Sequence, residues 1–228
     1  MRGAILAAFA ALVIAWGGPA GAQLENITNR EAVSALKTAL EKGSRAAVEQ
    51  LGRENGFYGD ARVKIPLPES LRRAERTLRR FGMGSYADEL VLAMNRAAEA
   101  AVPEAKQLFV DSVKKMTVQD AKGILTGGET AGTEYFKRTT SEQLRKRFLP
   151  VVQRSTEKVG LAQTYNQYAQ QAAAFGLVKA EHANLDAYVT QKALDGLYFM
   201  VAEEERKIRK DPVGAASSII KKVFGALL

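Results

Sequence analysis

The longest amphipathic stretch of the sequence, Glu89–Gly128, constrains the fold more than any other segment. Its apolar and small residues recur at steps of three and four, which places them on one side of a helix. The series comprises Leu90, Val91, Met94, Ala97, Ala98, Ala101, Val102 and Ala105, followed by Leu108, Phe109, Ser112, Val113 and Met116. Polar residues such as Arg96 and Glu99 fall elsewhere, and Pro103 marks a kink or break. Because many core-facing residues are alanines, a neighbouring helix can come close, and the stretch predicts the central helix of a bundle.

Helical periodicity continues through the rest of the chain, and no segment shows the sustained alternation of a strand. Helices are predicted at Asn29–Leu51, Glu69–Phe81, Val118–Leu125, Glu129–Thr139, from Ser141 towards Gly160, at Leu161–Phe175 and Asp186–Arg209, and from Val213 to the region of Phe224. Ser85 is the expected cap of the central helix, and Thr117 with Asp120 is the expected cap of the next. Val63–Pro68 carries two prolines and predicts an extended strap. The chain has no internal repeat, so the predicted fold class is all-α: a single-domain multi-helix bundle with one extended Pro-containing strap.

Residues 1–22 have the features of a secretory signal peptide. Arg2 supplies the positive start, and Ala4–Ala15 is an apolar run too short to span a bilayer. The tripeptide Ala20–Ala22 is a small-x-small cleavage site. The sequence therefore predicts export, with cleavage after Ala22 and an all-helical domain at 23–228. An uncleaved membrane anchor is the alternative.

The chain contains no cysteine and has a formal net charge of +8. A disulfide, a thiolate metal site and a thiol nucleophile are therefore excluded. An exported protein without disulfides is held together by packing alone, which indicates a bacterial envelope, and we expect a periplasmic location. In that compartment the anionic partners of a basic protein are lipid headgroups or acidic polymers rather than nucleic acid.

Four peptides of this chain are similar to segments of one bacterial family. They are Ile65–Leu71, Met94–Lys106, Lys122–Gly128 and Glu203–Val213. On these peptides the chain resembles the exported bacterial family catalogued as domain of unknown function 4197, over nearly all of the mature sequence. The resemblance implies an exported all-helical domain and supplies no activity, cofactor or catalytic residue. Many such proteins have a lipid-anchoring cysteine after the signal peptide, which this chain lacks.

The residue sets of common catalytic chemistry are missing. His182 is the only histidine and lies in a polar connection, so neither a metal site nor a Ser-His-Asp set is indicated. The glycine-rich segment Thr126–Gly132 lacks the Lys-Ser/Thr ending of a phosphate loop and predicts an interhelical turn. We therefore expect no enzyme activity, no metal and no cofactor. A carboxylate-based hydrolase is the weakest alternative that the sequence leaves open.

The predicted helix Glu69–Phe81 has a strongly basic face. One stripe of the helix is apolar and consists of Leu71, Ala74, Leu78 and Phe81. The opposite arc holds Arg72, Arg73, Arg76, Arg79 and Arg80. Such a face suits docking on anionic lipid headgroups or on an acidic partner. The alternative is a solvated basic face whose charges pair with nearby carboxylates.

Three predicted helices carry the side chains of a candidate apolar pocket. The candidate ligand-binding residues are Met94, Phe109, Tyr165, Tyr168, Leu197, Met200 and Glu204. Methionine and aromatic side chains with few polar groups are the usual make-up of a small-molecule pocket. Glu204 falls near the middle of an apolar arc, where a carboxylate needs a partner such as Arg96 or a ligand hydroxyl. The alternative is a solid core in which these residues pack on one another.

These patterns favour a periplasmic carrier that binds an apolar ligand, such as a lipid or a sterol-like molecule, without enzymatic activity. The main alternative is a structural or protein-interaction module of the bacterial envelope. Its partners would be an anionic membrane surface or an envelope protein. Nucleic acid is not an expected partner of either.

Overall fold

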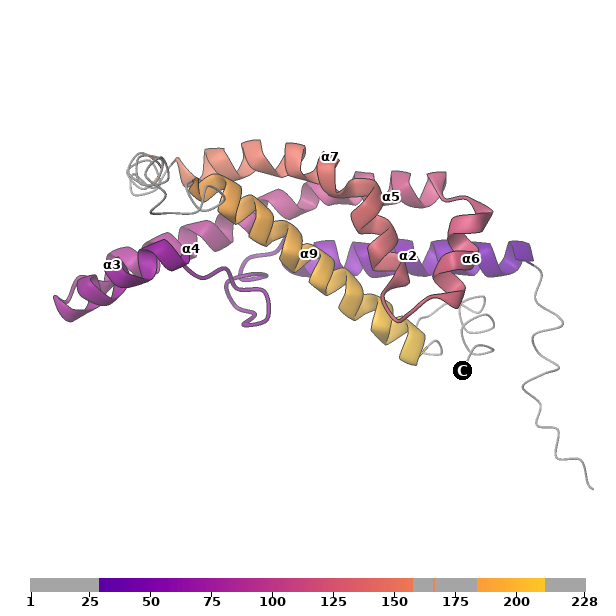
Figure 1. Cartoon of the computed structure of the whole chain (residues 1–228), viewed down its shortest axis with the longest axis horizontal. Helices are drawn as coiled ribbons and strands as arrows, with labels where there is room; N and C mark the ends of the chain where they lie inside the picture. The colour runs from indigo at the N-terminus through magenta and orange to yellow at the C-terminus, as the bar shows by residue number, and fades with distance from the viewer. Residues whose placement is uncertain (1–28, 158–165, 167–183, 212–228) are drawn as a thin grey trace, which may run out of the picture.

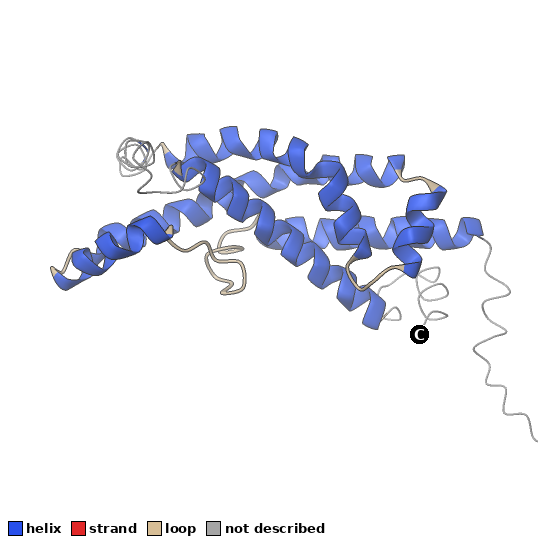
Figure 2. Ribbon diagram, viewed as in Figure 1, coloured by secondary structure: helices blue, strands red, loops and turns tan. Residues whose placement is uncertain are grey.

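The computed structural model describes residues 29–157, Asn166 and residues 184–211. Every regular element in these residues is a helix and none is a strand, so the predicted all-α class is confirmed (Figure 2). The predicted signal peptide, the helix Leu161–Phe175 apart from Asn166, His182 and the last helix lie outside the described residues.

The helices form an elongated bundle with a long central rod made of α4, η1 and α5 (Figure 1). The elements are α2 (Asn29–Leu51), α3 (Glu69–Arg80), α4 (Gly84–Ala101), η1 (Val102–Glu104), α5 (Ala105–Lys115), α6 (Val118–Thr126), α7 (Ala131–Thr156) and α9 (Leu185–Lys210). Helix α7 packs along α4 and α9, and α2 packs along α9 and α5. Helix α3 packs on the first half of α4, and the two project beyond one end of the bundle.

One continuous apolar core joins these helices. The ring centroids of Phe109 in α5 and Phe136 in α7 lie 4.6 Å apart. The buried face of α4 is rich in alanines, which allows α7 to pack closely along it. The predicted break at Pro103 is confirmed, because this proline lies in the 3-10 turn that separates α4 from α5.

Helix α7 is uninterrupted, so the prediction of one helix ending at Thr139 and another starting at Ser141 is wrong. The hydroxyl groups of Thr139, Thr140 and Ser141 donate to carbonyl oxygens four residues earlier, at 2.9, 2.6 and 2.7 Å. Thr140 and Ser141 also contact the Tyr198 hydroxyl of α9, at 2.9 and 3.1 Å. Packing against α9 therefore overrides the tendency of such residues to begin a new helix.

The helix ends follow the predictions at two places and differ at a third. Thr117 and Asp120 form a capping box, in which each side chain accepts the backbone N–H of the other at 3.0 and 3.1 Å. Gly82 follows α3 with a φ of 74°, a left-handed conformation that glycine adopts without strain. Ser85 does not cap α4; the N-cap is Met83, which makes no side-chain capping bond, and Ser85 lies inside the first turn.

The predicted strap runs in the segment between α2 and α3. Val63, Ile65 and Leu67 are buried, whereas Lys64 and Pro66 between them are exposed. Alternation with a period of two is the pattern of an extended backbone. The strap is therefore confirmed, and it covers one side of α4 near the base of the projecting helices (Figure 1).

Two polar residues of α4 fix the strap and the loop before it. The Asn95 amide accepts from the Ile65 N–H at 2.8 Å and donates to the Ile65 carbonyl at 2.9 Å. The Glu99 carboxylate accepts the backbone N–H groups of Phe57 and Tyr58 at 3.0 and 3.1 Å. Glu99 is thus buried, and its expected place off the apolar face of α4 is wrong. The sequence signal was present, because Asn95 and Glu99 are one helical turn apart.

Candidate docking site on the α3–α4 hairpin

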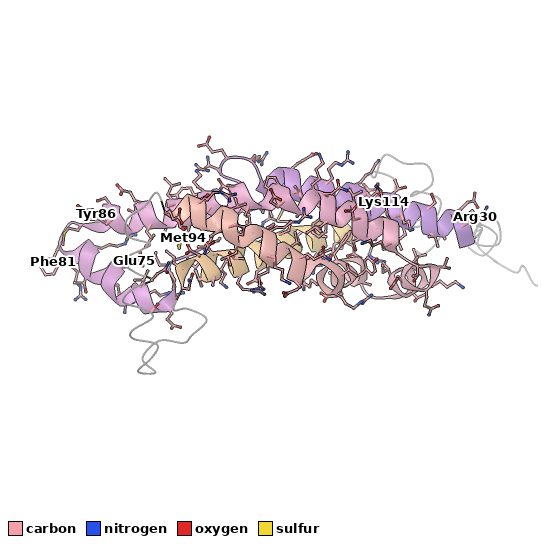
Figure 3. All side chains as sticks on the ribbon, turned by 90° about the horizontal axis from the view of Figure 1, so that it is seen from above. Arg30, Glu75, Phe81, Tyr86, Met94 and Lys114 are labelled. Carbon is pink, nitrogen blue, oxygen red and sulfur yellow. The ribbon has the colours of Figure 1, made fainter. Side chains whose placement is uncertain are left out.

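The α3–α4 hairpin, residues 69–92, is the part of the described chain that extends away from the bundle (Figures 1 and 3). It consists of α3, the turn 81–83 and the first half of α4. Phe81 and Tyr86 lie at its far end, while Arg30 and Lys114 lie towards the opposite end of the molecule. The hairpin therefore presents its tip to the surroundings rather than to the core.

The tip of the hairpin exposes large apolar side chains. Phe81 is 74% exposed, Tyr86 52% and Met83 42%, and Leu92 further down the hairpin is 37% exposed. Among the described residues, only Val118 and Phe199 are also large, apolar and exposed. Large apolar side chains that are exposed together at one end of a protein mark a surface that contacts something else.

The tip is also basic. Residues 76–86 contain Arg76, Arg79 and Arg80 and no acidic residue. Arg76 and Arg80 are exposed, and neither makes an ion pair with any carboxylate of the described chain. The cations beside the apolar tip are therefore available to an anion from outside the molecule.

Arg79 has a different role, because it joins the two helices of the hairpin. Its guanidinium contacts Glu75 of α3 at 3.0 Å and Asp88 of α4 at 2.6 Å. The hydrogen bond from Arg79 lowers the pKa of the Asp88 carboxyl, and the bonds to Asp88 and Glu75 raise the pKa of Arg79. A Cβ at Gly84 would lie 3.1 Å from the Arg79 guanidinium, so glycine keeps room for this contact. These bonds fix α3 against α4.

The five predicted docking arginines thus do not form one uniform face. Arg79 points to α4, Arg72 lines a groove between the hairpin and the strap, and Arg76 and Arg80 are exposed outside that groove. Arg73 belongs to the same helix, but its side chain lies outside the described ones. The docking surface that the structure supports is therefore narrower than the predicted one: Arg76 and Arg80 with the apolar tip.

The predicted ligand pocket is only partly described. Met94, Phe109, Leu197 and Met200 are 0–1% exposed and belong to the continuous core. Tyr165 and Tyr168 lie outside the described residues. A hollow of about 20 Å³ beside Gly43 and a groove of about 540 Å³ along the strap are both lined by other residues. The first has room for about one water molecule. The contacts of the four core residues match the solid-core alternative, and the carrier function stays a prediction.

Glu204 is not the buried carboxylate of α9, and its predicted position is wrong by one residue. Glu205 is buried and accepts from the N–H groups of Gly132 and Thr133, at 2.9 and 2.8 Å, and from the Thr133 hydroxyl at 2.8 Å. Its remaining partner is Arg209 at 2.9 Å. Consecutive helix positions differ by about 100°, and a carboxylate at position 205 faces the positive end of α7. The apolar stripe of α9 does not show which helix packs beside it, so the sequence could not indicate that α7 supplies the partners of Glu205.

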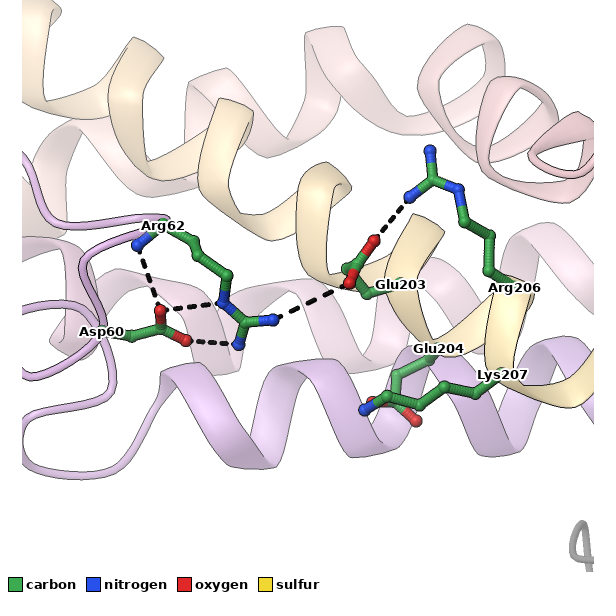
Figure 4. A network of polar contacts seen from close by, with 6 residues as sticks. All are labelled: Asp60, Arg62, Glu203, Glu204, Arg206 and Lys207. Carbon is green, nitrogen blue, oxygen red and sulfur yellow. Dashed lines mark hydrogen bonds and ion pairs between the residues drawn. The ribbon is translucent and has the colours of Figure 1, made fainter.

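Glu204 instead lies at the edge of the bundle. It pairs with Lys207 at 2.6 Å, and neighbouring Glu203 contacts Arg206 and Arg62 (Figure 4). The expected partner Arg96 contacts Glu99 and Glu54. Glu204 therefore forms an ordinary ion pair between neighbouring turns of α9, and the buried carboxylate of this helix is Glu205.

The described residues contain neither a group of metal-ligand side chains nor a membrane-spanning helix. Across residues 29–157 and 184–211, no three His, Asp or Glu side chains are grouped closely enough to hold a metal ion. None of the helices in these ranges is long and apolar enough to cross a membrane.

The fold and the hairpin together define an all-helical protein with a packed core and a projecting tip, where exposed apolar side chains lie beside arginines. The chain belongs to the family described as Protein of unknown function (DUF4197), whose model matches residues 26–225. The resemblance inferred from the four peptides is thereby confirmed. Comparisons with curated proteins and with solved structures give no match.

Proposed function

We propose that this protein is a non-enzymatic module of the bacterial envelope that docks on an anionic membrane surface through the tip of the α3–α4 hairpin. The observation that carries the proposal is the position of exposed apolar side chains beside arginines at the end of the hairpin. Phe81, Met83 and Tyr86 are exposed at the end of a projecting hairpin and lie next to arginines in the sequence. Residues 76–86 contain no Asp or Glu. An apolar tip flanked by cations is the composition of protein segments that bind the membrane interface.

The energetics of such docking are sufficient for reversible binding. Burying a phenylalanine side chain contributes about 1.5–3 kcal/mol. Each arginine close to an anionic membrane surface contributes about 1 kcal/mol, and this part is screened by salt. Aromatic side chains such as Tyr86 favour the headgroup level, where the ring is buried and the hydroxyl stays hydrated. Attachment through a few such contacts is peripheral and salt-sensitive.

The hairpin is stiff enough to carry its tip into the interface. Arg79 bonds α3 to α4, and α4 continues through η1 into the core of the bundle. Asn95 and Glu99 hold the preceding loop and strap against the same helix. A preorganised surface loses less conformational entropy on binding than a flexible one.

Binding to lipid vesicles tests the proposal. The protein is mixed with vesicles of phosphatidylglycerol and phosphatidylethanolamine, or of phosphatidylcholine alone, and the bound fraction is measured by flotation. We expect binding to the anionic vesicles only, with release as the salt concentration rises. Replacing two cations together, Arg76→Gln with Arg80→Gln, should weaken binding about 30-fold.

A matched variant controls for net charge. Lys114→Gln with Lys115→Gln removes the same charge at the opposite end of the molecule (Figure 3) and should leave binding nearly unchanged. Equal losses in both double variants would show non-specific attraction and contradict docking by the tip. Absence of vesicle binding, together with an envelope protein that co-purifies, would favour the protein-interaction alternative.

A further inference from the structure

A groove of about 540 Å³ lies between the strap and the inner side of the α3–α4 hairpin. The strap and the preceding loop contribute Tyr58, Lys64 and Pro66, and the hairpin contributes Arg72 and Val91. Its volume is in the range of small-molecule sites. The groove is distinct from the exposed tip, because none of Phe81, Met83 and Tyr86 lines it.

The groove carries surplus positive charge. Its lining holds three cations, Lys64, Arg72 and Arg79, against two carboxylates, so the formal charge is +1. The two carboxylates, Glu75 and Asp88, share the guanidinium of Arg79. The other two cations of the lining are Lys64 and Arg72, and neither makes an ion pair with a carboxylate in the described part of the chain. Lys64 acts on Asp88 only at longer range. An anion that enters the groove would therefore meet two cations that no carboxylate contacts directly.

The same groove offers apolar surface beside these cations. The Lys64 ammonium lies 3.9 Å from the centre of the Tyr58 ring, which fixes both side chains relative to each other. Pro66 and Val91 contribute apolar atoms to the lining. The combination of two cations without an ion-pair partner and an aromatic and aliphatic wall is complementary to a molecule that is anionic at one end and apolar behind it.

The wall formed by the strap is preformed. The Tyr188 hydroxyl of α9 donates to the Pro66 carbonyl at 3.0 Å, and Asn95 of α4 holds both backbone polar groups of Ile65. A site whose wall is already fixed does not need to be ordered when a ligand binds.

We propose that this groove binds one single-chain anionic amphiphile, with its phosphate or carboxylate head between Lys64 and Arg72 and its first methylenes against Tyr58, Pro66 and Val91. The ligand is a single molecule taken up from solution, so the site goes beyond docking of the tip on a bilayer. It also differs from the pocket predicted from the sequence, whose described residues lie in the core.

Titration calorimetry with dodecyl phosphate below its critical micelle concentration tests this site. We expect one molecule bound per chain, and binding about tenfold weaker or worse in Lys64→Gln, which removes a charged hydrogen-bond donor. Ala61→Trp fills the groove from an exposed loop position and should abolish binding. The matched controls Lys114→Gln and Ala100→Trp, also at exposed positions, should bind as the original protein does.

Two further ligands measure the contributions of the charged head and of the alkyl chain separately. Inorganic phosphate and the uncharged dodecyl maltoside should each bind at least about tenfold more weakly than dodecyl phosphate. Equal binding of inorganic phosphate would mean a simple anion site, and equal binding of the maltoside would mean an apolar groove; either result overturns the proposal. So does unchanged affinity in Lys64→Gln or Ala61→Trp, with circular dichroism and urea unfolding as the check that each variant is folded.

Phe81→Ser distinguishes this site from the docking proposal. It should lower binding to anionic vesicles while leaving dodecyl phosphate binding unchanged. In the wild-type protein, binding of dodecyl phosphate without binding to anionic vesicles would reject the docking proposal alone. Binding to vesicles without binding of dodecyl phosphate would reject the amphiphile site alone.

Discussion

The α7–α9 interface and the α3–α4 hairpin place similar side chains in opposite surroundings. At the interface, Glu205 is buried and accepts hydrogen bonds from five donor atoms of Gly132, Thr133 and Arg209. On the hairpin, Arg76 and Arg80 are exposed, and no carboxylate of the described chain pairs with them. Phenylalanine shows the same contrast: Phe109 is 1% exposed and Phe81 is 74% exposed.

The contrast separates residues that maintain the fold from residues that are free to bind something else. A buried carboxylate without partners is costly, so a fully bonded one such as Glu205 is explained by the fold itself. Exposed apolar and basic side chains at a projecting tip contribute little to folding. They therefore need an explanation outside the molecule, which docking on a membrane provides.

The two phenylalanines give the largest expected difference. Phe109→Ala should lower the free energy of unfolding by about 3–5 kcal/mol, because it leaves a cavity in a packed core. Phe81→Ala should change it by less than about 0.5 kcal/mol, as exposed positions usually do. Urea denaturation measures both values. Similar losses in the two variants would mean that the hairpin tip is part of the folded core.

Adjacent glutamates of α9 sharpen the comparison within one helix. Glu205→Gln should cost about 3 kcal/mol of stability, since it removes the negative charge that Arg209 faces and turns an amide donor towards N–H groups. Glu204→Gln removes a surface ion pair with Lys207 and should cost at most about 0.5 kcal/mol. Thermal unfolding of the two variants side by side is the measurement. A larger loss for Glu204→Gln would support the position inferred from the helical wheel.

Enlarging a core residue tests whether the bundle holds a ligand cavity. Met200 is fully buried, so Met200→Trp should overpack the core and destabilise the protein by about 1–3 kcal/mol. Chemical denaturation gives this value, and organic extraction with mass spectrometry shows whether lipid co-purifies. A stable variant that loses a lipid retained by the original protein would instead restore the predicted carrier.

The ion pair inside the hairpin gives the smallest effect, visible through pH. Hydrogen bonding to Arg79 lowers the pKa of Asp88, so the folded state binds this proton less readily than the unfolded chain. Its stabilising contribution is present above the ordinary pKa of an aspartate and is lost as the pH falls through the lowered value. Carboxyl carbon NMR should show Asp88 titrating below the usual range, and Arg79→Gln should raise its pKa. An unchanged titration in that variant would remove Arg79 as the cause.

Much of the fold could be predicted because it depends on local patterns. The bounds of α2, the capping box of α6, the break at Pro103 and the alternating strap all follow from residues close in sequence. The continuity of α7 could not, because Tyr198 of a distant helix bonds to its hydroxyl residues. The same limit explains Glu205, whose partners are the amides at the start of α7.

The candidate site was predicted only in part for a similar reason. The basic helix could be recognised from its spacing, but Arg79 pairs with Asp88, and Arg72 turns to the strap. The sequence does not predict the exposure of Phe81 either, because the spacing of this residue continues the apolar stripe of its helix. Its position beyond α3, next to Gly82, places it at the tip instead.

A tryptophan at the tip tests the docking claim most directly. The one native tryptophan, Trp16, lies in the predicted signal peptide, so Phe81→Trp gives the only indole in the predicted mature protein. When phosphatidylglycerol vesicles are added, docking by the tip predicts that the tryptophan fluorescence of this variant shifts to shorter wavelength. Lipids brominated on the acyl chains should quench it. Phe199→Trp, at an exposed position on α9, should show neither effect. An unshifted, unquenched Phe81→Trp spectrum on vesicles, or equal quenching at position 199, would contradict insertion of the hairpin tip.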